Sequence, residues 1–82
     1  MQIRPLNVLV KKQIARFGLG SKFEKQKLLF EANSFHPSLH TEKLEPKSVG
    51  LYSFRIDRKY RAIFRIRDGM AEIVHVTKHY EK

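Results

Sequence analysis

The chain has 82 residues, with 17 Lys or Arg against 8 Asp or Glu, a net charge of +9 and a pI near 10.2. A chain this short predicts one domain with a small core, and the lack of cysteine excludes disulfides and thiolate metal sites. No apolar run reaches the length of a membrane span or a signal h-region, so we expect a soluble, cytoplasmic protein without a membrane partner. Such a basic domain usually meets a polyanion, such as nucleic acid, the ribosome or an acidic protein.

The first part of the chain predicts a helix that begins after Asn7, a favourable N-cap, and runs to about Phe17. Gly18 and Gly20 follow and end the helix. Apolar residues recur at helical spacing and form one stripe, which consists of Leu6, Leu9, Val10, Ile14 and Phe17.

A second helix is predicted to follow directly. Ser21 and Glu24 have the spacing of a capping box, which marks a helix start. The helix is expected to close at Asn33 and Ser34, before Pro37. Its expected buried line consists of Leu28, Ala32 and Phe35, with Leu29 beside it.

Residues 51–66 predict a β-hairpin, because two runs with period-2 alternation lie on either side of residues 57–59. A three-residue loop over 58–60 pairs Ile56 with Ala62 and puts both apolar sets on one face. The opposite face then carries Ser53, Arg55, Arg61, Ile63 and Arg65.

Asp68-Gly69 is the strongest turn signal in the chain, and a third strand is predicted to follow over 71–77. A two-residue turn would oppose Arg65 to Glu72 as a charge pair, but would leave Val74 and Val76 on the arginine side. The alternation alone therefore allows two registers for the third strand, one with this two-residue turn and one with a longer loop.

We prefer a three-residue loop over 67–69, because it sends Val74 and Val76 to the core and opposes Arg61 to His75. Residues 1–4 could add a short strand in front. The predicted fold class is α+β, with two N-terminal helices packed on one face of a small antiparallel sheet of three or four strands.

The arginine face suggests a chemistry. Arginine makes bidentate, permanently charged contacts to phosphate, and histidine can move a proton near neutral pH. Together they suit metal-free cleavage of RNA, in which the 2′-hydroxyl attacks the adjacent phosphate. The alternative is that Arg55, Arg61 and Arg65 only keep an exposed sheet face hydrated.

The four histidines do not predict a metal site. Pro37 interrupts the pair His36 and His40, and the pair His75 and His79 begins in a strand, where four residues span about 13 Å. That separation is too long for two ligands of one ion. The chain also lacks a nucleophile elbow and a glycine-rich phosphate loop, so neither a metal nor another cofactor is expected.

Several segments resemble the RelE/ParE superfamily of toxins from toxin–antitoxin modules. They are Lys43-Leu44 followed by Gly50, the run Tyr-Ser-Phe-Arg-Ile at 52–56, the run Tyr-Arg-Ala-Ile-Phe at 60–64, and the closing His79-Tyr80. The resemblance is strongest over residues 40–80. It implies two helices on an antiparallel sheet, an acidic antitoxin encoded beside the toxin, and either ribosome-dependent cleavage of mRNA or, as in ParE-like members, poisoning of gyrase.

The resemblance also implies roles for individual residues. Arg61 matches the position that binds the scissile phosphate in the RNases, and Arg55 matches a basic position on the preceding strand. His79 and Tyr80 are similar to the C-terminal pair of YoeB-like enzymes, in which the histidine is a general acid or base. The RNA contacts that we expect in addition are Lys43, Arg58, Lys59, Arg65 and His75.

The catalytic set departs from both templates within the superfamily. The glutamate base of YoeB-like enzymes aligns with Ser38, with Glu42 and Glu45 out of register, and Ser53 and Glu81 replace two basic residues of RelE-like members. The favoured function is a ribosome-dependent, metal-independent mRNA endoribonuclease that inhibits translation. The alternatives are a non-enzymatic gyrase inhibitor and a degenerate toxin that only binds its antitoxin.

Overall fold

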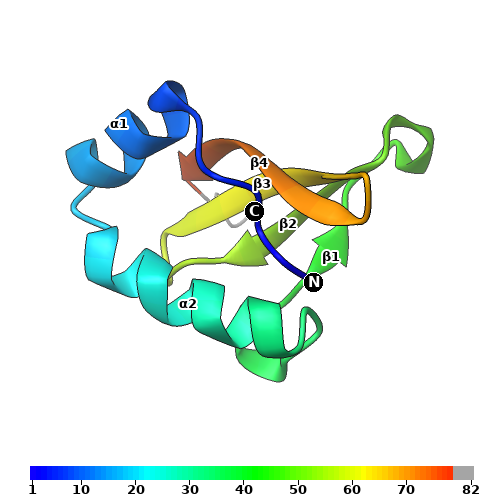
Figure 1. Cartoon of the computed structure of the whole chain (residues 1–82), viewed down its shortest axis with the longest axis horizontal. Coiled ribbons are helices and arrows are strands. Elements are labelled where there is room, and N and C mark those ends of the chain that lie inside the picture. The colour runs from blue at the N-terminus through cyan, green and yellow to red at the C-terminus, as the bar shows by residue number, and fades with distance from the viewer. Residues whose placement is uncertain (79–82) are drawn as a thin grey trace.

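The computed structural model describes residues 1–78 and shows two helices beside a four-stranded antiparallel sheet (Figure 1). The helices are α1 (Val8–Arg16) and α2 (Gly20–Ala32), and the strands are β1 (Glu42–Lys43), β2 (Leu51–Arg55), β3 (Tyr60–Arg67) and β4 (Met70–Lys78). Short 3-10 helices, η1 (Pro37–Leu39) and η2 (Lys47–Val49), lie on either side of β1. Sequential strands are neighbours in the order β1-β2-β3-β4. The predicted α+β class is confirmed.

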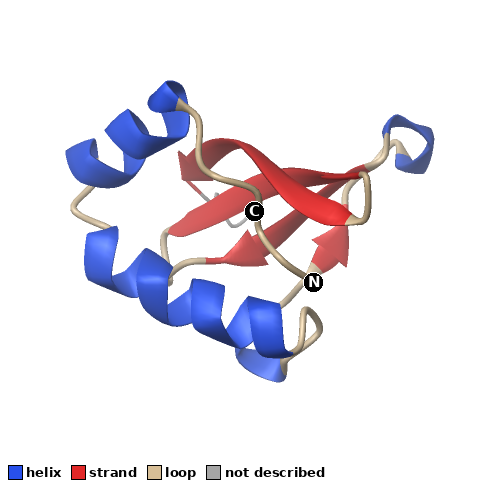
Figure 2. Cartoon of the chain, in the orientation of Figure 1, coloured by secondary structure: helices blue, strands red, loops and turns tan. Residues whose placement is uncertain are grey.

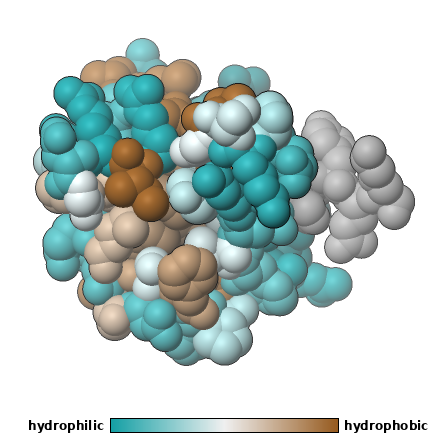
Figure 3. All heavy atoms as spheres, turned by 90° about the vertical axis from the view of Figure 1, so that its right-hand side faces the viewer, coloured by the Kyte–Doolittle hydropathy of each residue, from teal (hydrophilic) through white to brown (hydrophobic). Residues whose placement is uncertain are grey.

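The helices and the sheet form two layers, as Figure 2 shows by colour. One cluster of buried apolar side chains lies between them, and its aromatic members are Phe23, Phe30, Phe54 and Phe64. The end of the molecule that carries η2 faces the viewer in Figure 3, where hydrophilic residues cover most of the surface and apolar residues emerge in patches. Within residues 1–78, no helix is long and apolar enough to cross a membrane.

Helix α1 begins where the sequence predicts. The side chain of Asn7 accepts a hydrogen bond of 2.8 Å from the backbone N–H of Val10, as an N-cap should. Val10 and Ile14 are buried, whereas Leu9 from the predicted stripe is exposed. The N-terminal segment pairs with β4 through a single parallel bridge between Ile3 and Ala71, instead of forming a full strand.

Helix α2 exists as predicted, but its buried face is different. It begins at Gly20 without a side-chain cap, so the expected capping box is wrong. Leu28 and Phe35, which we expected in the core, are 70% and 72% exposed. The residues that face the sheet, at spacings of four, three and four, are Leu19, Phe23, Gln26 and Phe30.

Aromatic packing explains this phase of α2. The ring of Phe30 lies 4.9 Å from that of Phe54 and 5.2 Å from that of Phe64, between centroids. Aromatic side chains bury the largest apolar area, so the stripe that holds Phe23 and Phe30 outcompetes the leucine stripe. Gln26 is tolerated within it because its amide donates to two backbone carbonyls, those of Arg55 and Ser38.

The β2–β3 hairpin has the predicted faces but not the predicted register. Phe54 pairs with Ala62, and Arg55 pairs with Arg61, so the partners differ by two residues from those expected. The loop is 57–59, because the carboxylate of Asp57 accepts hydrogen bonds from the backbone N–H groups of Lys59 and Tyr60, both 2.8 Å. A shift of two residues keeps each side chain on its face, which is why the apolar side is correct.

The β3–β4 connection corrects our preferred register. Asp68 and Gly69, with φ of 52° and 75°, form a two-residue turn that opposes Arg65 to Glu72. A bulge between Ile63 and Phe64 then shifts the pairing by one residue. Beyond the bulge the partners are Ile63 with His75, Ala62 with Val76 and Arg61 with Thr77, so the predicted Arg61–His75 pair is wrong. The bulge allows both the charge pair and the burial of Val76.

The phase of α2 can be tested with a pair of alanine variants. Phe30→Ala should lower the free energy of unfolding by about 3–5 kcal/mol, because it removes a fully buried ring and leaves a cavity. Leu28→Ala on the exposed side of the same helix should change it by less than about 0.5 kcal/mol. Urea unfolding followed by circular dichroism measures both. Equal losses in the two variants would contradict the phase described here.

The Asp57 turn predicts a dependence of stability on pH. Burial raises the pKa of Asp57, but the hydrogen bonds from Lys59, Tyr60 and Lys22 outweigh it, so the pKa lies below its ordinary value. The carboxylate therefore stabilises the fold at neutral pH, and this contribution disappears as the pH falls below about 4. Urea unfolding at a series of acid pH values measures this effect. Asp57→Asn should have a lower free energy of unfolding than the wild type at pH 7, and this free energy should fall less than that of the wild type as the pH is lowered.

Asp68→Asn is the matched control for this experiment. Asp68 lies in the next turn, is exposed, and has no ion pair within residues 1–78. Asparagine also tolerates the positive φ of this position. The Asp68→Asn profile should follow the wild type, and an acid loss in Asp57→Asn as steep as that of the wild type would overturn the assignment.

Candidate functional site

The sheet face that points away from the helices carries the predicted arginines. Ser53 and Arg55 alternate with the core residues of β2, and Arg61 lies directly opposite Arg55 on β3. Neighbouring cross-strand side chains have Cβ atoms about 5 Å apart. The structure therefore brings Arg55 and Arg61 together, as the alternation predicts, although the predicted partner of Arg55 was Ile63.

We expected Arg61 to be an exposed surface residue. In the structure it is only 6% exposed. Its Nε donates to the hydroxyl of Ser53 at 2.9 Å, and its Nη2 donates to the backbone carbonyl of His40. His40 has a left-handed backbone, with φ of 45°. Arg61 thus ties β3 both to β2 and to the segment that leads into β1.

A carboxylate that the sequence comparison did not assign lies beside this arginine. Glu42 pairs with Ser53 across β1 and β2, which places it on the same sheet face as Arg61. Its Oε1 lies 3.9 Å from Nη2 of Arg61, and 57% of its side chain is exposed. Strand pairing thus brings Glu42, which seemed out of register along the chain, to the site.

The charges of the site influence one another. Burial lowers the pKa of Arg61, the negative charge of Glu42 raises it, and the positive charge of Arg55 lowers it further. Arginine nevertheless stays protonated in proteins. The site therefore holds a fixed positive charge between an accessible carboxylate and a second guanidinium, and it can accept a proton at Glu42 and stabilise an anion at Arg55.

Arg65, predicted to contact RNA, has a carboxylate partner instead. Its Nη2 lies 2.6 Å from Oε1 of Glu72, and Nη1 of Arg67 lies 2.9 Å from Oε2 of the same carboxylate. Arg4 approaches it at 3.9 Å. The hydrogen bonds from Arg65 and Arg67 lower the pKa of Glu72. Arg65 and Arg67 therefore share a carboxylate partner within the protein.

The other predicted residues are dispersed. Lys43 lies over the ring of Tyr52, with Nζ 5.6 Å from the ring centroid. Arg58 and Lys59 are exposed in the β2–β3 turn, and His75 is exposed opposite Ile63. His79 and Tyr80, the predicted C-terminal catalytic pair, lie outside the described residues.

The described histidines do not gather as metal ligands. In the first pair, Nδ1 of His36 accepts a hydrogen bond of 3.2 Å from the backbone N–H of Ser38 and lies 2.9 Å from its hydroxyl. Across residues 1–78, no three His, Asp or Glu side chains lie close enough to hold an ion. The chemistry available to the described site is thus that of a carboxylate and two guanidinium groups.

The fold is that of the RelE/ParE toxins. The YoeB–YefM complex from Staphylococcus aureus is 18% identical, with a TM-score of 0.70, over 98% of this chain and 100% of that chain. A YoeB/ParE toxin from Agrobacterium tumefaciens is 16% identical, with a TM-score of 0.72 and the same coverages. A copper-bound mutant toxin from Helicobacter pylori is 13% identical, with a TM-score of 0.72, over 96% of each chain. No protein-family model and no curated protein matches the sequence.

The role of Ser53 in holding Arg61 can be tested by Ser53→Ala. The variant leaves a buried, charged N–H without its acceptor, which should lower the free energy of unfolding by about 1–3 kcal/mol. Ser48→Ala, on the exposed 3-10 helix η2, is the control and should change it by less than about 0.5 kcal/mol. Chemical denaturation measures both variants, and indistinguishable midpoints would show that Ser53 does not hold Arg61.

Proposed function

We propose that the chain is the toxin of a toxin–antitoxin module and acts as a ribosome-dependent, metal-independent endoribonuclease on mRNA. The observation that carries this proposal is the approach of Glu42 to Arg61, beside Arg55, on the sheet face opposite the helices. A proton acceptor for the 2′-hydroxyl and cations that stabilise the charged phosphate are two of the requirements of RNA cleavage by its own 2′-hydroxyl. The fold shared with YoeB toxins agrees with this function.

The proposed reaction needs no external cofactor. Glu42 takes the proton of the 2′-hydroxyl, whose oxygen attacks the adjacent phosphorus. The bond to the 5′-oxygen of the next nucleotide breaks, which leaves a 2′,3′-cyclic phosphate on one fragment. The resemblance assigns the protonation of the departing 5′-oxygen to His79, with Tyr80 beside it.

The two arginines have different parts in this proposal. Arg55 is half-buried and has no carboxylate within 4 Å among the described residues, so it can contact the phosphate directly. Arg61 is mostly enclosed by its own hydrogen bonds. It supplies charge to the site and holds β1, and thereby Glu42, in place. Both contributions are fixed before substrate binds, which favours stabilisation of the developing charge.

We also propose two kinds of partner. The net charge of +9 suits the ribosome with its mRNA, and it equally suits an acidic antitoxin that inhibits the toxin. The Staphylococcus aureus YoeB structures were determined with YefM, in one case as a heterotetramer. A protein encoded beside this chain is the first candidate for the antitoxin.

Glu42→Gln tests the nuclease proposal. In a translation extract, with primer extension to map mRNA breaks, the wild-type protein should cut mRNA and Glu42→Gln should cut about 10²–10⁴ times more slowly, because the proton acceptor is lost. The folded state should change little, since the side chain of Glu42 is 57% exposed and Arg61 keeps its hydrogen bonds to Ser53 and His40. Glu45→Gln, an exposed glutamate three residues away, should cut like the wild type.

Two results would contradict the nuclease proposal. One is intact mRNA with the wild-type protein in ribosome extract. The other is equal cleavage by the wild type and Glu42→Gln. Loss of DNA supercoiling by purified gyrase in the presence of the wild-type protein, with mRNA intact, would instead establish the gyrase inhibitor.

A further inference from the structure

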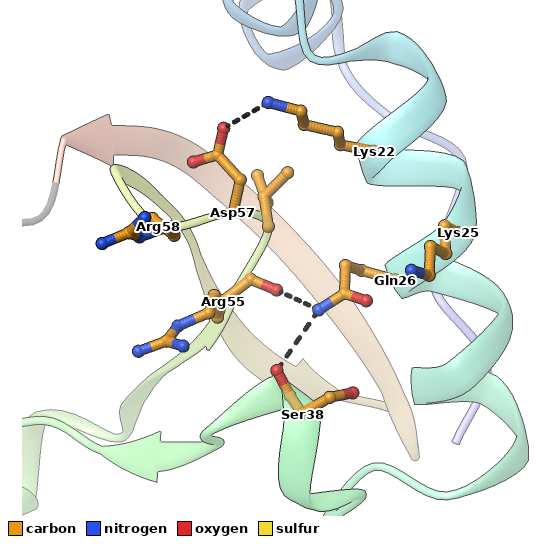
Figure 4. Close-up of a pocket in the computed structure, with 8 residues that line it drawn as sticks. Lys22, Lys25, Gln26, Ser38, Arg55, Asp57 and Arg58 are labelled. Carbon is orange, nitrogen blue, oxygen red and sulfur yellow. Dashed lines mark hydrogen bonds and ion pairs between the residues drawn. The ribbon is translucent and has the colours of Figure 1, made fainter.

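A cavity lies beside the candidate site, between α2 and the β2–β3 turn (Figure 4). Its volume is about 410 Å³, within the range of roughly 300–1,000 Å³ that small-molecule sites occupy. Lys22 and Lys25 from α2 and Arg55 and Arg58 from the hairpin line it. The cavity is thus large enough for a phosphate group together with an attached sugar.

The charges that line this cavity are unbalanced. Asp57 is its only lining carboxylate, and it lies 3.1 Å from Nζ of Lys22 while also accepting the backbone N–H groups of the turn. Within the described chain, Lys25, Arg55 and Arg58 have no carboxylate within 4 Å. Three cations therefore share a concave surface without a counter-charge, which favours an anionic ligand.

The walls of the cavity are fixed by a buried hydrogen bond. Gln26, only 7% exposed, donates from Nε2 to the carbonyl of Arg55 at 2.8 Å and to that of Ser38 at 3.4 Å. One side chain thereby joins α2, η1 and β2, and Figure 4 shows both bonds as dashed lines. A cavity held in this way is formed before a ligand arrives, which lowers the entropy cost of binding.

The cavity is continuous with the candidate site through Arg55. This residue lines the cavity and is also the direct cross-strand partner of Arg61. Like charges in opposed positions destabilise a sheet, and a bound anion would offset their repulsion. The cations nearest to Arg61 along this surface are therefore Arg55 and those that line the cavity, where further phosphates of a bound strand can make contacts.

We propose that this cavity is a second phosphate subsite, which binds a phosphodiester of the same RNA strand next to the one that is cut. The subsite rests on the proposed nuclease function. A nucleic acid fits better than the carboxylates of an acidic protein for two reasons. Its phosphates are linked at regular intervals along one strand, so they can occupy both sites at once, and the guanidinium groups of Arg55 and Arg58 can hold phosphate oxygens in pairs.

The test is RNA binding by a double variant, Lys25→Ala with Arg58→Ala. The probe is a short, fluorescent, single-stranded RNA with 2′-O-methyl groups throughout, which the proposed reaction cannot cleave, and anisotropy is measured over a range of salt concentrations. Loss of the one phosphate that this subsite neutralises should weaken binding and reduce the slope of log K against log[salt] by about 0.7. The control, Lys12→Ala with Lys47→Ala, removes the same charge from exposed positions outside the cavity, and should keep the wild-type slope.

The outcomes separate the subsite from the nuclease. If the Lys25/Arg58 variant keeps the wild-type affinity and slope, or if the control loses as much as this variant does, the subsite is wrong even where the wild type cleaves mRNA. If the variant binds RNA like the wild type but loses affinity for polyglutamate, the cavity accepts protein carboxylates and the subsite is again wrong. A selective loss of RNA binding supports the subsite, and mRNA cleavage by the wild type in the translation extract shows separately whether the protein is a nuclease.

Discussion

The buried guanidinium of Arg61 is the constraint on which the site depends. Removal of a charge from water costs several kcal/mol unless hydrogen bonds satisfy it. Here the hydroxyl of Ser53 and the carbonyl of His40 do so, and both belong to other segments of the chain. The need to satisfy one charge therefore holds the approach to β1 against the sheet. This arrangement brings Glu42 to the site, although β1 is only two residues long.

The helix layer reaches the site through a single buried amide. The core between the layers is aromatic and apolar, so it has no polar group with which to orient the arginines. Gln26 is the exception, since it replaces an apolar residue in the stripe of α2 and bonds to the carbonyl of Arg55. A glutamine in this stripe interrupts the hydrophobic pattern, but its hydrogen bond holds the strand that carries Arg55. A local violation of patterning thus marks a position next to the candidate site.

The parts of the structure that were predictable from the sequence follow from periodicity. Alternation placed Phe54 and Arg55 on opposite faces, and that assignment survives any register shift by an even number of residues. The exact partners depended on the side-chain hydrogen bonds of Asp57 and on the bulge at Ile63, neither of which has a hydrophobic pattern. The face of α2 was missed because two apolar stripes compete and only the tertiary contacts of Phe30 decide between them. Glu42 was missed because its neighbour Arg61 is distant in sequence.

The distribution of acidic residues explains why the excess positive charge matters at one end of the sheet. At the β3–β4 end, Arg65 and Arg67 both pair with the carboxylate of Glu72. At the β2–β3 end, Asp57 is occupied by Lys22 and by its own turn, which leaves Arg55 and Arg58 without a described carboxylate. The net charge of +9 is thus not spread evenly over the described surface. Because the attraction between exposed charges decays within about 10 Å in salt, the proposed RNA strand would be held where cations lack partners, and Arg55 in that region is the cross-strand partner of Arg61.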